Sequence, residues 1–419
     1  MTTCPYLPWN QTNSANKRTV AIVVGAGIAG VSTCYSLIKR GFKVILIDQE
    51  EQAGSHASGN HAGLLMPAMT TVPSTFSEYY IQAFNHSIKQ AHLLAESYEF
   101  GFKPSGIIQL AFNERQQIRQ TKWLEIDEYS YLLDYLDQTQ IKKISGLPFP
   151  YNGILFKNAA WLSPIEFVAA YLNDIKESIT TIFNQKATKI HYENEEWNVF
   201  NSSEKLLATA PVLIIANAIG GKELIKDIPM SIRSVRGQLS MISNNPTMLP
   251  LKIPVSYDGY LVPAKFGNQW IGASFSEMMT KDCLVQDRRY NIKQLENIYP
   301  EFSHDETSYN DITQDRAAFR CISSDYFPLV GPVPCGNYFR KNYLRLIQDR
   351  KPSSYPPAHY LPGLYMNLAH GSRGMISAPF ASELLAREIC GEPLDISLKC
   401  REYIHPGRFL IRQLKKGVA

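Results

Sequence analysis

The chain has 419 residues, a length typical of two or three domains, and carries a formal net charge of +4. Its hydrophobic content of 45% is enough to fill more than one core. No stretch reaches the roughly 18 consecutive apolar residues that a membrane helix needs, so we expect no membrane partner. The small positive charge is compatible with a polyanionic partner but does not indicate one, because most such surpluses lie on a solvated surface.

The N-terminal residues and the cysteines indicate the cellular compartment of the protein. Met1–Arg18 is polar and rich in Asn and Thr and lacks the apolar core of a signal peptide, so we predict a loose leader over residues 1–18. The seven cysteines are odd in number and form no C-x-x-C pair, which favours neither a zinc site nor a complete disulfide framework. We therefore expect a cytoplasmic protein that uses no metal.

Three glycines at G-x-G-x-x-G spacing follow the first apolar run, Thr19–Val24, which reads as a buried parallel strand. Gly25 suits the tight turn, Gly27 lets the backbone approach a pyrophosphate, and Gly30 lets the next helix pack closely on the sheet. A bare G-x-G-x-x-G is a weak signal, because glycines also cluster in turns.

The continuation of the chain strengthens the signal. An amphipathic helix is predicted to about Arg40, and a second strand, Lys43–Ile47, delivers Asp48 to the place where a ribose hydroxyl needs an acceptor. The N-terminus of the helix would receive the negative phosphates. Strand, glycines, helix, strand and acid together predict a complete dinucleotide-binding unit.

A nicotinamide dehydrogenase would normally continue with another helix–strand repeat after Asp48. Here a loop rich in glycine and serine follows instead, Gly54–Pro67, and such a loop can run along an extended ligand. The sequence then predicts a long helix at about 77–100, a strand at 106–110, surface helices to about 140 and a helix that begins at Pro164.

The second half of the chain adds strands. Alternating strands between 188 and 208 precede a second buried strand, Pro211–Ala216, and the pattern from Arg236 onward is largely β. We expect two interleaved domains, in which three separate stretches form the nucleotide fold and a mostly antiparallel sheet is inserted between them.

Six blocks of sequence resemble the D-amino-acid-oxidase-like FAD oxidoreductases, the family of the glycine and sarcosine oxidases. The blocks lie at 57–67, 161–166, 256–263, 271–275, 320–334 and 370–379. The resemblance covers nearly the whole chain from Thr19. Blocks 57–67 and 320–334, with the C-terminal 406–417, are more particular to the branch of the family that modifies the wobble uridine of tRNA.

The resemblance implies an α/β plus α+β fold. A Rossmann-like FAD-binding domain would comprise residues 19–100, 145–230 and 320–419, interleaved with a mostly antiparallel β-sheet substrate domain of residues 101–144 and 231–319. It also implies noncovalent FAD, because Cys321 is offset from the position at which some relatives bond the cofactor. The branch often has a methyltransferase domain before the oxidase, and only about 18 residues stand there in this chain, so we expect this chain to catalyse the oxidative step alone; a separate methyltransferase acting next is a candidate partner.

The activity that the resemblance implies is oxidation of a carbon between an amine and a carboxylate. In the tRNA branch the substrate is the carboxymethylaminomethyl group on the wobble uridine, and the products are 5-aminomethyluridine and glyoxylate. The partners are then the anticodon loop of tRNA and dioxygen or another electron acceptor. Two alternatives stay open: a glycine- or sarcosine-type oxidase acting on a free small amino acid or secondary amine, and a flavin-containing binding protein without turnover.

Three catalytic residues are carried over from the family. Arg320 stands five residues before Asp325 of the D-x-x-P motif and would clamp the substrate carboxylate; a surface arginine in a salt bridge is the alternative. Tyr260 matches a tyrosine that faces the substrate, or else a packed tyrosine of the sheet. Arg373, in G-S-R-G, would pair with the pyrimidine edge of the flavin or with the substrate, or else cap a helix.

The expected cofactor contacts come from the glycine motif, the second strand, the loop and the later blocks. They are Gly25, Gly27, Ile28, Ala29, Gly30, Asp48, Ser58, Gly59, Asn60, Gly63, Leu64, Ala216, Gly371, Ser372, Arg373, Gly374 and Met375. We assign no proton transfer to the histidines near this site, which are His56, His61 and His370.

Four cations near the C-terminus are candidates for RNA contacts. They are Arg408, Arg412, Lys415 and Lys416, at helical or near-helical spacing beside apolar residues. They would grip RNA phosphates, although an ordinary exposed amphipathic helix has the same pattern.

Overall fold

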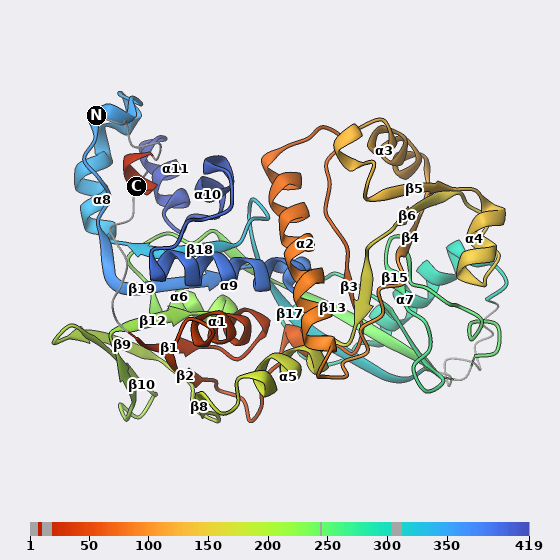
Figure 1. Ribbon diagram of the computed structural model, residues 1–419, viewed down its shortest axis with the longest axis horizontal. Coiled ribbons are helices and arrows are strands. Elements are labelled where there is room, and N and C mark those ends of the chain that lie inside the picture. Colours follow the sequence, from red (N-terminus) through yellow and green to blue (C-terminus); the bar gives the residue numbers. More distant parts are fainter. Residues whose placement is uncertain (1–6, 11–18, 244, 303–311, 419) are drawn as a thin grey trace. The chain divides into compact units, whose positions relative to one another are not determined.

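The computed structural model (Figure 1) describes residues 7–10, 19–243, 245–302 and 312–418. The chain forms two compact units, and each is described by itself. Unit 1 contains residues 1–58, 168–234 and 321–419, and unit 2 contains residues 59–167 and 235–320. Compactness therefore places 59–100 and 145–167 in unit 2, whereas the sequence analysis assigns them to the FAD-binding domain. The functional domain boundaries stay a prediction.

Unit 1 is built on a six-stranded sheet of order β18-β19-β12-β1-β2-β8. Its strands are β1 (Val20–Val24), β2 (Lys43–Ile47), β8 (Ile179–Ile182), β12 (Val212–Ile215), β18 (Leu329–Pro334) and β19 (Tyr360–Leu368). All neighbours are parallel except β18 and β19. The central strands β1 and β12 read as unbroken apolar runs because elements cover both faces of the sheet.

Helices α1 (Ile28–Ile38) and α9 (Gly374–Cys390) lie side by side in unit 1 (Figure 1). A buried polar network joins them: Ser32 Oγ lies 2.8 Å and Thr33 Oγ1 3.0 Å from Ser382 Oγ, and Asn367 of β19 donates to both Thr33 and Ser382. Each hydroxyl is satisfied, so the network fixes the register of the two helices rather than destabilising the core.

Other elements of unit 1 share a second core with the sheet. Residues such as Ile22, Leu213 and Met366 pack there with Trp197 of a three-stranded antiparallel sheet and with Phe409 near the C-terminus. The elements are β9 (Lys189–Glu193), β10 (Glu196–Phe200), β11 (Leu206–Ala210), α6 (Gly221–Leu224), α8 (Gly336–Tyr343) and α11 (Arg408–Leu414). Helix α10 (Leu398–Ile404) contacts α11 and β18 instead.

Unit 2 is built on an eight-stranded sheet of order β17-β13-β16-β15-β14-β4-β6-β5, and a short antiparallel pair, β3 and β7, is separate from it. The strands are β3 (Gly63–Leu65), β4 (Ile107–Leu110), β5 (Leu133–Leu136), β6 (Gly153–Phe156), β7 (Ala160–Leu162), β13 (Ile232–Ser243), β14 (Val255–Ser256), β15 (Tyr260–Leu261), β16 (Asn268–Gly272) and β17 (Ile312–Ser323). The helices are α2 (Thr75–Ala95), α3 (Glu114–Leu124), α4 (Gln138–Ser145), α7 (Val285–Ile298) and α5 (Pro164–Asp174), which continues into unit 1.

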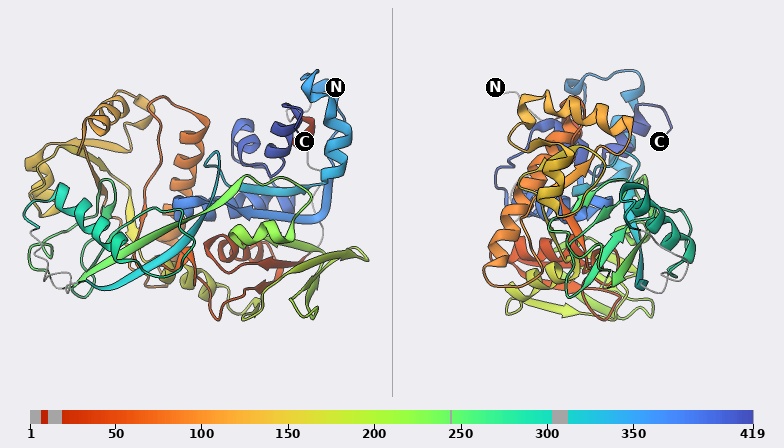
Figure 2. Two further views of the ribbon diagram at one scale, coloured as in Figure 1. Left: turned by 180° about the vertical axis from the view of Figure 1, so that it is seen from behind. Right: turned by 90° about the vertical axis from the view of Figure 1, so that its right-hand side faces the viewer.

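Two separate apolar clusters accompany the large sheet. Helix α7 lies against the large sheet (Figure 2). Its residues Ile292 and Leu295 belong to one apolar cluster with strand residues such as Ile108 and Ile271. A smaller cluster joins Ala62 and Trp161, from the segment of β3 and β7, to Trp270 and to the partly buried Tyr260. The predicted substrate residue Tyr260 thus belongs to the smaller cluster, away from the helix.

The mixed α/β fold with one mainly parallel and one mainly antiparallel sheet confirms the predicted fold class. Some local predictions were wrong. Strand β5 interrupts the stretch that was expected to hold only surface helices, and β3 forms inside the predicted loop 54–67. Part of the predicted leader is packed: Trp9 is 5% exposed and contacts Tyr343 and Tyr355, whereas residues 1–6 and 11–18 lie outside the described residues.

Candidate active site and cofactor-binding residues

The glycine motif of unit 1 forms the turn between β1 and α1. Gly25 has φ +107°, and a Cβ there would lie 2.7 Å from the carbonyl carbon of Ala216. A Cβ on Gly30 would lie 1.7 Å from the carbonyl oxygen of Gly25 and 3.5 Å from Val23 of β1. Gly25 and Gly30 therefore have no room for a side chain, and the latter sets how closely the helix meets the strand, as the spacing predicted.

Gly27 differs from its two neighbours in the motif. Its backbone is extended, with φ −75°, and a Cβ there would meet only the Ser58 hydroxyl, at 3.3 Å. The same hydroxyl accepts a 3.0 Å hydrogen bond from the backbone N–H of Ile28, the first residue of α1. A side chain here would require Ser58 to shift slightly, so the packing excludes one less strictly than at Gly25 and Gly30, and the position at the N-terminus of the helix suits the close approach of an anionic ligand.

Asp48 follows β2 and reaches back to the glycine turn. One carboxylate oxygen accepts from the Ala26 N–H at 2.5 Å and the other accepts from the Glu50 N–H at 2.9 Å. Each oxygen keeps a second lone pair, so the side chain can still accept a ribose hydroxyl. These bonds fix the orientation of the carboxylate.

The block 371–375 lies in the same unit, at the start of α9. Gly371 has φ +61° in a 3-10 turn, Gly371–Arg373, that leads into the helix at Gly374. A Cβ on Gly374 would lie 3.7 Å from Ile28 Cγ2, so the first residues of α1 and α9 are neighbours although they are far apart in the sequence. Two helix N-termini that converge in this way favour an anionic ligand such as a dinucleotide.

The histidines of unit 1 have structural surroundings. His370 accepts from Ser377 at Nδ1 and donates to Asn367 from Nε2, at 2.8 and 2.9 Å, and burial lowers its pKa to about 3. His56 lies 2.8 Å from Glu50 on the surface. A neutral, fully hydrogen-bonded ring such as that of His370 is unsuited to accept a proton, which agrees with the prediction.

Arg320 lies on β17 in unit 2, and in this sheet β17, β13 and β16 are neighbouring strands. Its guanidinium crosses the neighbouring strand β13 at Gly237, where a Cβ would lie 1.9 Å from Nη1. It ends against Phe275, whose ring centroid is 4.7 Å from Cζ. A side chain at 237 would therefore block this path.

One donor of the Arg320 guanidinium is unsatisfied among the described residues. Its Nη1 atom is buried, and within the described part of the chain it has no hydrogen-bond partner. Burial lowers the pKa of Arg320, and Tyr260 opposes this in part, but arginine keeps its charge at neutral pH. A half-buried cation with a buried, unsatisfied donor favours a carboxylate ligand.

Tyr260 is held beside the β3 segment. Its hydroxyl donates to the carbonyl oxygen of Ala62 at 3.0 Å. Burial raises its pKa to about 12, and the charge of Arg320 opposes the shift. The phenol is therefore neutral at physiological pH and keeps a lone pair for a ligand.

Further predicted residues of unit 2 gather near these side chains. Asn60 accepts from Arg316 Nη1 at 2.6 Å, and Gly63 and Leu64 pair with Leu162 and Trp161 across β3 and β7. His61 stacks on Trp270 with a centroid distance of 5.2 Å, and burial and the charge of Arg316 lower its pKa. The 57–67 block is thus tied to both β16 and β17.

The structure brings the predicted residues together in two groups, one in each unit. Gly25 to Asp48, Ser58, Ala216 and 371–375 gather in unit 1, whereas Asn60, Gly63, Leu64, Tyr260 and Arg320 gather in unit 2. The sequence analysis missed Arg316, Gly237 and Phe275. The period of two along β17 could have indicated Arg316, four residues before Arg320, but nothing in the sequence shows which glycine lies beneath the guanidinium.

The prediction for Arg408 was wrong. Its side chain is 6% exposed and makes two 2.9 Å hydrogen bonds to Asp325, the acid of the D-x-x-P motif. Arg412 contacts the same carboxylate at 2.5 Å. Helical spacing puts Arg408 and Arg412 on one face of α11, where Arg408 is buried against Asp325 and the Arg412 side chain is still 41% exposed.

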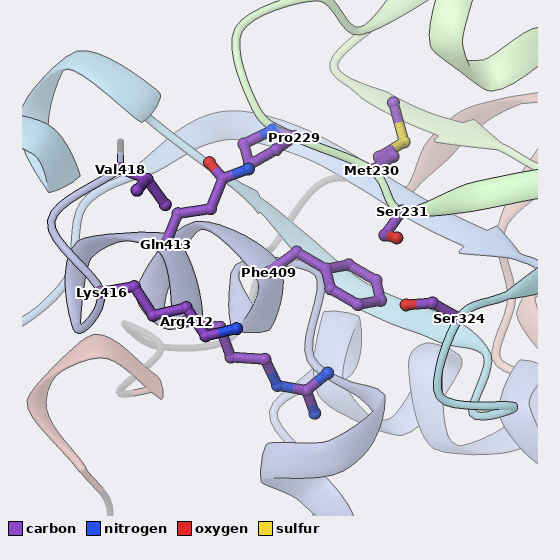
Figure 3. A pocket seen from close by; sticks show the side chains of 9 residues that line it. All are labelled: Pro229, Met230, Ser231, Ser324, Phe409, Arg412, Gln413, Lys416 and Val418. Atoms are coloured by element: carbon purple, nitrogen blue, oxygen red, sulfur yellow. The ribbon is translucent and has the colours of Figure 1, made fainter.

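A pocket of about 560 Å³ lies beside α11 within unit 1 (Figure 3). Figure 3 shows that it is lined by Pro229, Met230, Ser231, Ser324, Phe409, Arg412, Gln413, Lys416 and Val418. Lys416 is exposed and Lys415 is half-buried, 5.1 Å from the Trp9 ring. Of the four C-terminal cations, Arg412 and Lys416 therefore line the pocket, and Lys415 does not.

The described residues contain neither a candidate metal site nor a candidate membrane-spanning helix. No group of three or more His, Cys, Asp and Glu side chains there is arranged to hold a metal ion. None of the described helices is both long and apolar enough to cross a membrane.

Residues 21–388 match the family described as FAD dependent oxidoreductase, so the chain belongs to this family of FAD-dependent oxidoreductases. Its cofactor is FAD, which agrees with the residues at the N-termini of α1 and α9. The chain is 31% identical over 402 residues to the "tRNA 5-methylaminomethyl-2-thiouridine biosynthesis bifunctional protein MnmC" of Pseudomonas fluorescens, covering 95% of this chain and 60% of that protein. The protein of the same name from Ectopseudomonas mendocina is 32% identical, covering 98% of this chain and 62% of the relative.

The chain thus spans about 60% of the length of these relatives. Among solved structures, glycine oxidase from Geobacillus kaustophilus aligns with a TM-score of 0.73 at 18% identity, covering 91% of this chain and 96% of the other. L-proline dehydrogenase from P. horikoshii aligns with a TM-score of 0.73 at 16% identity, covering 94% and 98%. These alignments confirm the predicted D-amino-acid-oxidase-like fold.

Gly27→Val tests the cofactor site. A Cβ at this position would lie 3.3 Å from the Ser58 hydroxyl, so only Ser58 has to shift, and we expect the variant to fold while its side chain holds the backbone away from the pyrophosphate. FAD affinity should fall by about tenfold or more. FAD released on denaturation and the melting temperature of the apoprotein measure the two effects separately. A variant that retains full FAD occupancy would contradict this placement of the phosphates.

Asp325→Asn tests the structural role assigned to the C-terminal arginines. The variant leaves Arg408 buried without a counterion, so the free energy of unfolding at pH 7 should fall by about 3–5 kcal/mol. Urea unfolding measures it, and FAD content reports on the cofactor site. A variant as stable as wild type would show that the ion pair contributes nothing.

The same ion pair predicts a pH dependence. Burial alone would raise the pKa of Asp325, but hydrogen bonds and charge from Arg408 and Arg412 lower it to about 2. The folded pKa lies below the unfolded value of roughly 4, so the stabilisation is present above pH 4 and is lost as the pH falls toward 2. Asp325→Asn should lack this acid-dependent component.

Proposed function

We propose that this protein oxidises the carboxymethylaminomethyl group of a tRNA wobble uridine, with FAD as the oxidant. The observation that carries the proposal is the half-buried Arg320, whose buried Nη1 donor lacks a partner among the described residues, because the glycine-like end of this group supplies the missing carboxylate. The name of the relatives at 31–32% identity, which places them in 5-methylaminomethyl-2-thiouridine biosynthesis on tRNA, supports the choice of substrate.

The reaction needs little acid–base catalysis. FAD supplies the two-electron oxidation of the carbon between amine and carboxylate. The imine that remains adds water across its C=N bond, and the C–N bond then breaks to give 5-aminomethyluridine and glyoxylate. The amine must be neutral when the C–H bond breaks, and solution buffers can take its proton. The rate then depends on positioning and on electrostatics.

The residues of unit 2 would supply the positioning. Arg320 would hold the substrate carboxylate through its two-pronged donor geometry. Tyr260 stays protonated because its pKa is about 12, so it would orient a ligand by hydrogen bonding rather than act as a base. Arg373, at the start of α9 in unit 1, would pair with the cofactor or the substrate.

FAD would be held noncovalently. The residues proposed for its phosphates and ribose are those at the N-termini of α1 and α9 together with Asp48. Cys321 is buried, and burial raises the pKa of its thiol to about 12, so it is protonated and a poor nucleophile. Dioxygen or another acceptor would reoxidise the flavin, and a methyltransferase would consume the free amine that the reaction produces.

The pocket beside α11 is the proposed RNA contact surface. Lys416 lines this pocket and Lys415 precedes it in the chain, so both remain candidates for phosphate contacts, although Lys415 is not part of the pocket lining. Arg412, which also lines the pocket, contributes charge while it holds Asp325. Arg408 is excluded because it is buried. Phosphate contacts release counterions, so binding through this surface should weaken steeply with salt.

Modified tRNA tests the proposed function. Anaerobic addition of tRNA that carries 5-carboxymethylaminomethyluridine should bleach the flavin and yield 5-aminomethyluridine plus glyoxylate, whereas free glycine and sarcosine should react far more slowly. Stopped-flow absorbance and nucleoside mass spectrometry measure the two steps. Efficient oxidation of glycine with no reaction of the modified tRNA would instead establish a small-amine oxidase.

The same assay separates the RNA surface from the chemistry. The double variant Lys415→Gln/Lys416→Gln should weaken tRNA use and flatten its salt dependence at unchanged FAD content. Lys176→Gln/Lys205→Gln is the matched control, since both of these lysines of unit 1 are exposed and lie outside the pocket lining. If the two pairs behave alike, the RNA surface lies elsewhere and the function stands.

Gly237→Ala tests the clamp without removing its charge. A Cβ would overlap Nη1, so Arg320 must move, and a displacement of about 1 Å costs on the order of 100-fold in turnover. Arg320→Ala should lose turnover as well, and Arg320→Lys should restore little because it lacks the planar fork.

A double variant identifies the cause. In an Arg320→Ala background there is no guanidinium to displace, so Gly237→Ala should cause no further loss. FAD content should stay at the wild-type level in all of these variants. Wild-type turnover by Gly237→Ala or by Arg320→Ala would show that the carboxylate is held by another residue.

A further inference from the structure

Phe275 is an exposed aromatic residue that contacts the proposed clamp. Its side chain is 62% exposed, and the guanidinium of Arg320 lies 4.7 Å from its ring centroid. Met278 and Met279 follow in the same segment and are 48% and 73% exposed. An apolar surface of this kind beside a functional cation needs an explanation, because exposed large apolar groups usually mark a binding surface.

The backbone on both sides of Phe275 is fixed. Ser274 N donates to the Gln238 carbonyl at 3.1 Å, and Ser276 and Arg236 exchange two backbone hydrogen bonds of 3.0 and 2.9 Å. The segment therefore continues the pairing of β16 with β13 beyond Gly272. The ring is thus presented to solvent from a hydrogen-bonded strand and not from an irregular loop.

The two faces of the ring have different surroundings. One contacts the guanidinium that crosses Gly237, so the exposure of the side chain must come from the rest of the ring. The exposed part of the ring is apolar, so a planar, uncharged group could stack on it, whereas a phosphate gains no stacking from an aromatic ring. The surface is therefore suited to a base and not to a backbone phosphate.

The proposed substrate has such a group at the right reach. Four bonds separate its carboxylate carbon from C5 of the uracil ring, which amounts to about 5 Å when the linker is extended. The Arg320 guanidinium lies 4.7 Å from the ring centroid of Phe275, so a base about 5 Å from a carboxylate held by Arg320 can reach the Phe275 ring. Free glycine has no group that reaches this surface.

We propose that Phe275 is the stacking platform for the uracil base of the substrate, and that it accounts for preference for the modified nucleoside over free amino acids. This inference rests on the proposed function. Stacking of a base on an aromatic side chain is sequence-tolerant and needs only an exposed ring face, and RNA-binding proteins commonly read unstacked bases in this way.

The test compares substrates with and without a base. For Phe275→Ala in the FAD-loaded enzyme, the KM for the modified tRNA and the Kd for the modified nucleoside should rise by about 10-fold to 100-fold. Phe275→Tyr should retain wild-type values because it keeps the ring, and Phe275→Leu should behave like Ala because it does not. Inhibition by glycolate, which has the carboxylate but no base, should change less than threefold.

Phe266→Ala is the matched control. Phe266 is the same residue type in the same unit and is 92% exposed, at a turn between residues 265 and 268. Its substitution should leave KM and FAD content unchanged. An equal rise of KM in the two variants would show a general loss of apolar surface and would overturn the proposal.

The remaining outcomes are distinguishable. If wild type oxidises the modified tRNA and Phe275→Ala has the same KM, the stacking role is wrong and the function stands. If Phe275→Ala raises the inhibition constant of glycolate as much as the KM, Phe275 acts only by positioning Arg320, which also overturns the proposal. If wild type leaves the modified tRNA unoxidised, the proposed function and this inference fail together.

Discussion

A desolvated guanidinium is the constraint around which unit 2 is arranged. Removing a charge from water costs several kcal/mol unless a partner replaces the lost hydration, and for Nη1 of Arg320 no described residue does so. The strand order β17-β13-β16 and the absence of a side chain at Gly237 allow the guanidinium to take this position. The fold therefore maintains an unsatisfied donor, which a substrate carboxylate would satisfy.

The residues of unit 1 that are expected to bind the dinucleotide include few charged side chains. The converging N-termini of α1 and α9 provide oriented N–H groups, and the buried network of Ser32, Thr33, Ser382 and Asn367 keeps the helices in register. Close contact at Gly30 sets the distance from helix to strand. Backbone N–H groups at helix N-termini can thus bind an anionic ligand without a cluster of lysines.

The contrast explains which parts could be predicted from sequence. The dinucleotide-binding unit is local: strand, glycines, helix and acid lie within thirty residues, and each has a backbone reason that can be read from spacing. The clamp is nonlocal, because Arg320, Gly237 and Phe275 come from three strands whose order depends on tertiary packing. The resemblance to known enzymes indicated Arg320 and Tyr260. That Gly237 lies beneath the guanidinium and Phe275 at its end is visible only in the folded structure.

The error over Arg408 has the same origin. Helical spacing placed cations and apolar residues together but did not show which of them face the core. Asp325 decides this: it lies near the C-terminal helix in space and pairs with Arg408 and Arg412 at once. Charge pattern alone cannot distinguish a cation held by a buried carboxylate from one that is available to a phosphate.

Selectivity is the remaining problem for any enzyme that grips a glycine-like group. Free glycine and glycine attached to uridine present the same carboxylate and amine, so a clamp alone binds both. Discrimination must come from contacts beyond the amine. A ring held by strand hydrogen bonds on both sides loses little conformational freedom when a base stacks on it, so most of the stacking energy would remain for binding. The same ring offers free glycine nothing, and a rigid aromatic group beside the clamp is therefore sufficient to favour the larger substrate without excluding the smaller one by shape.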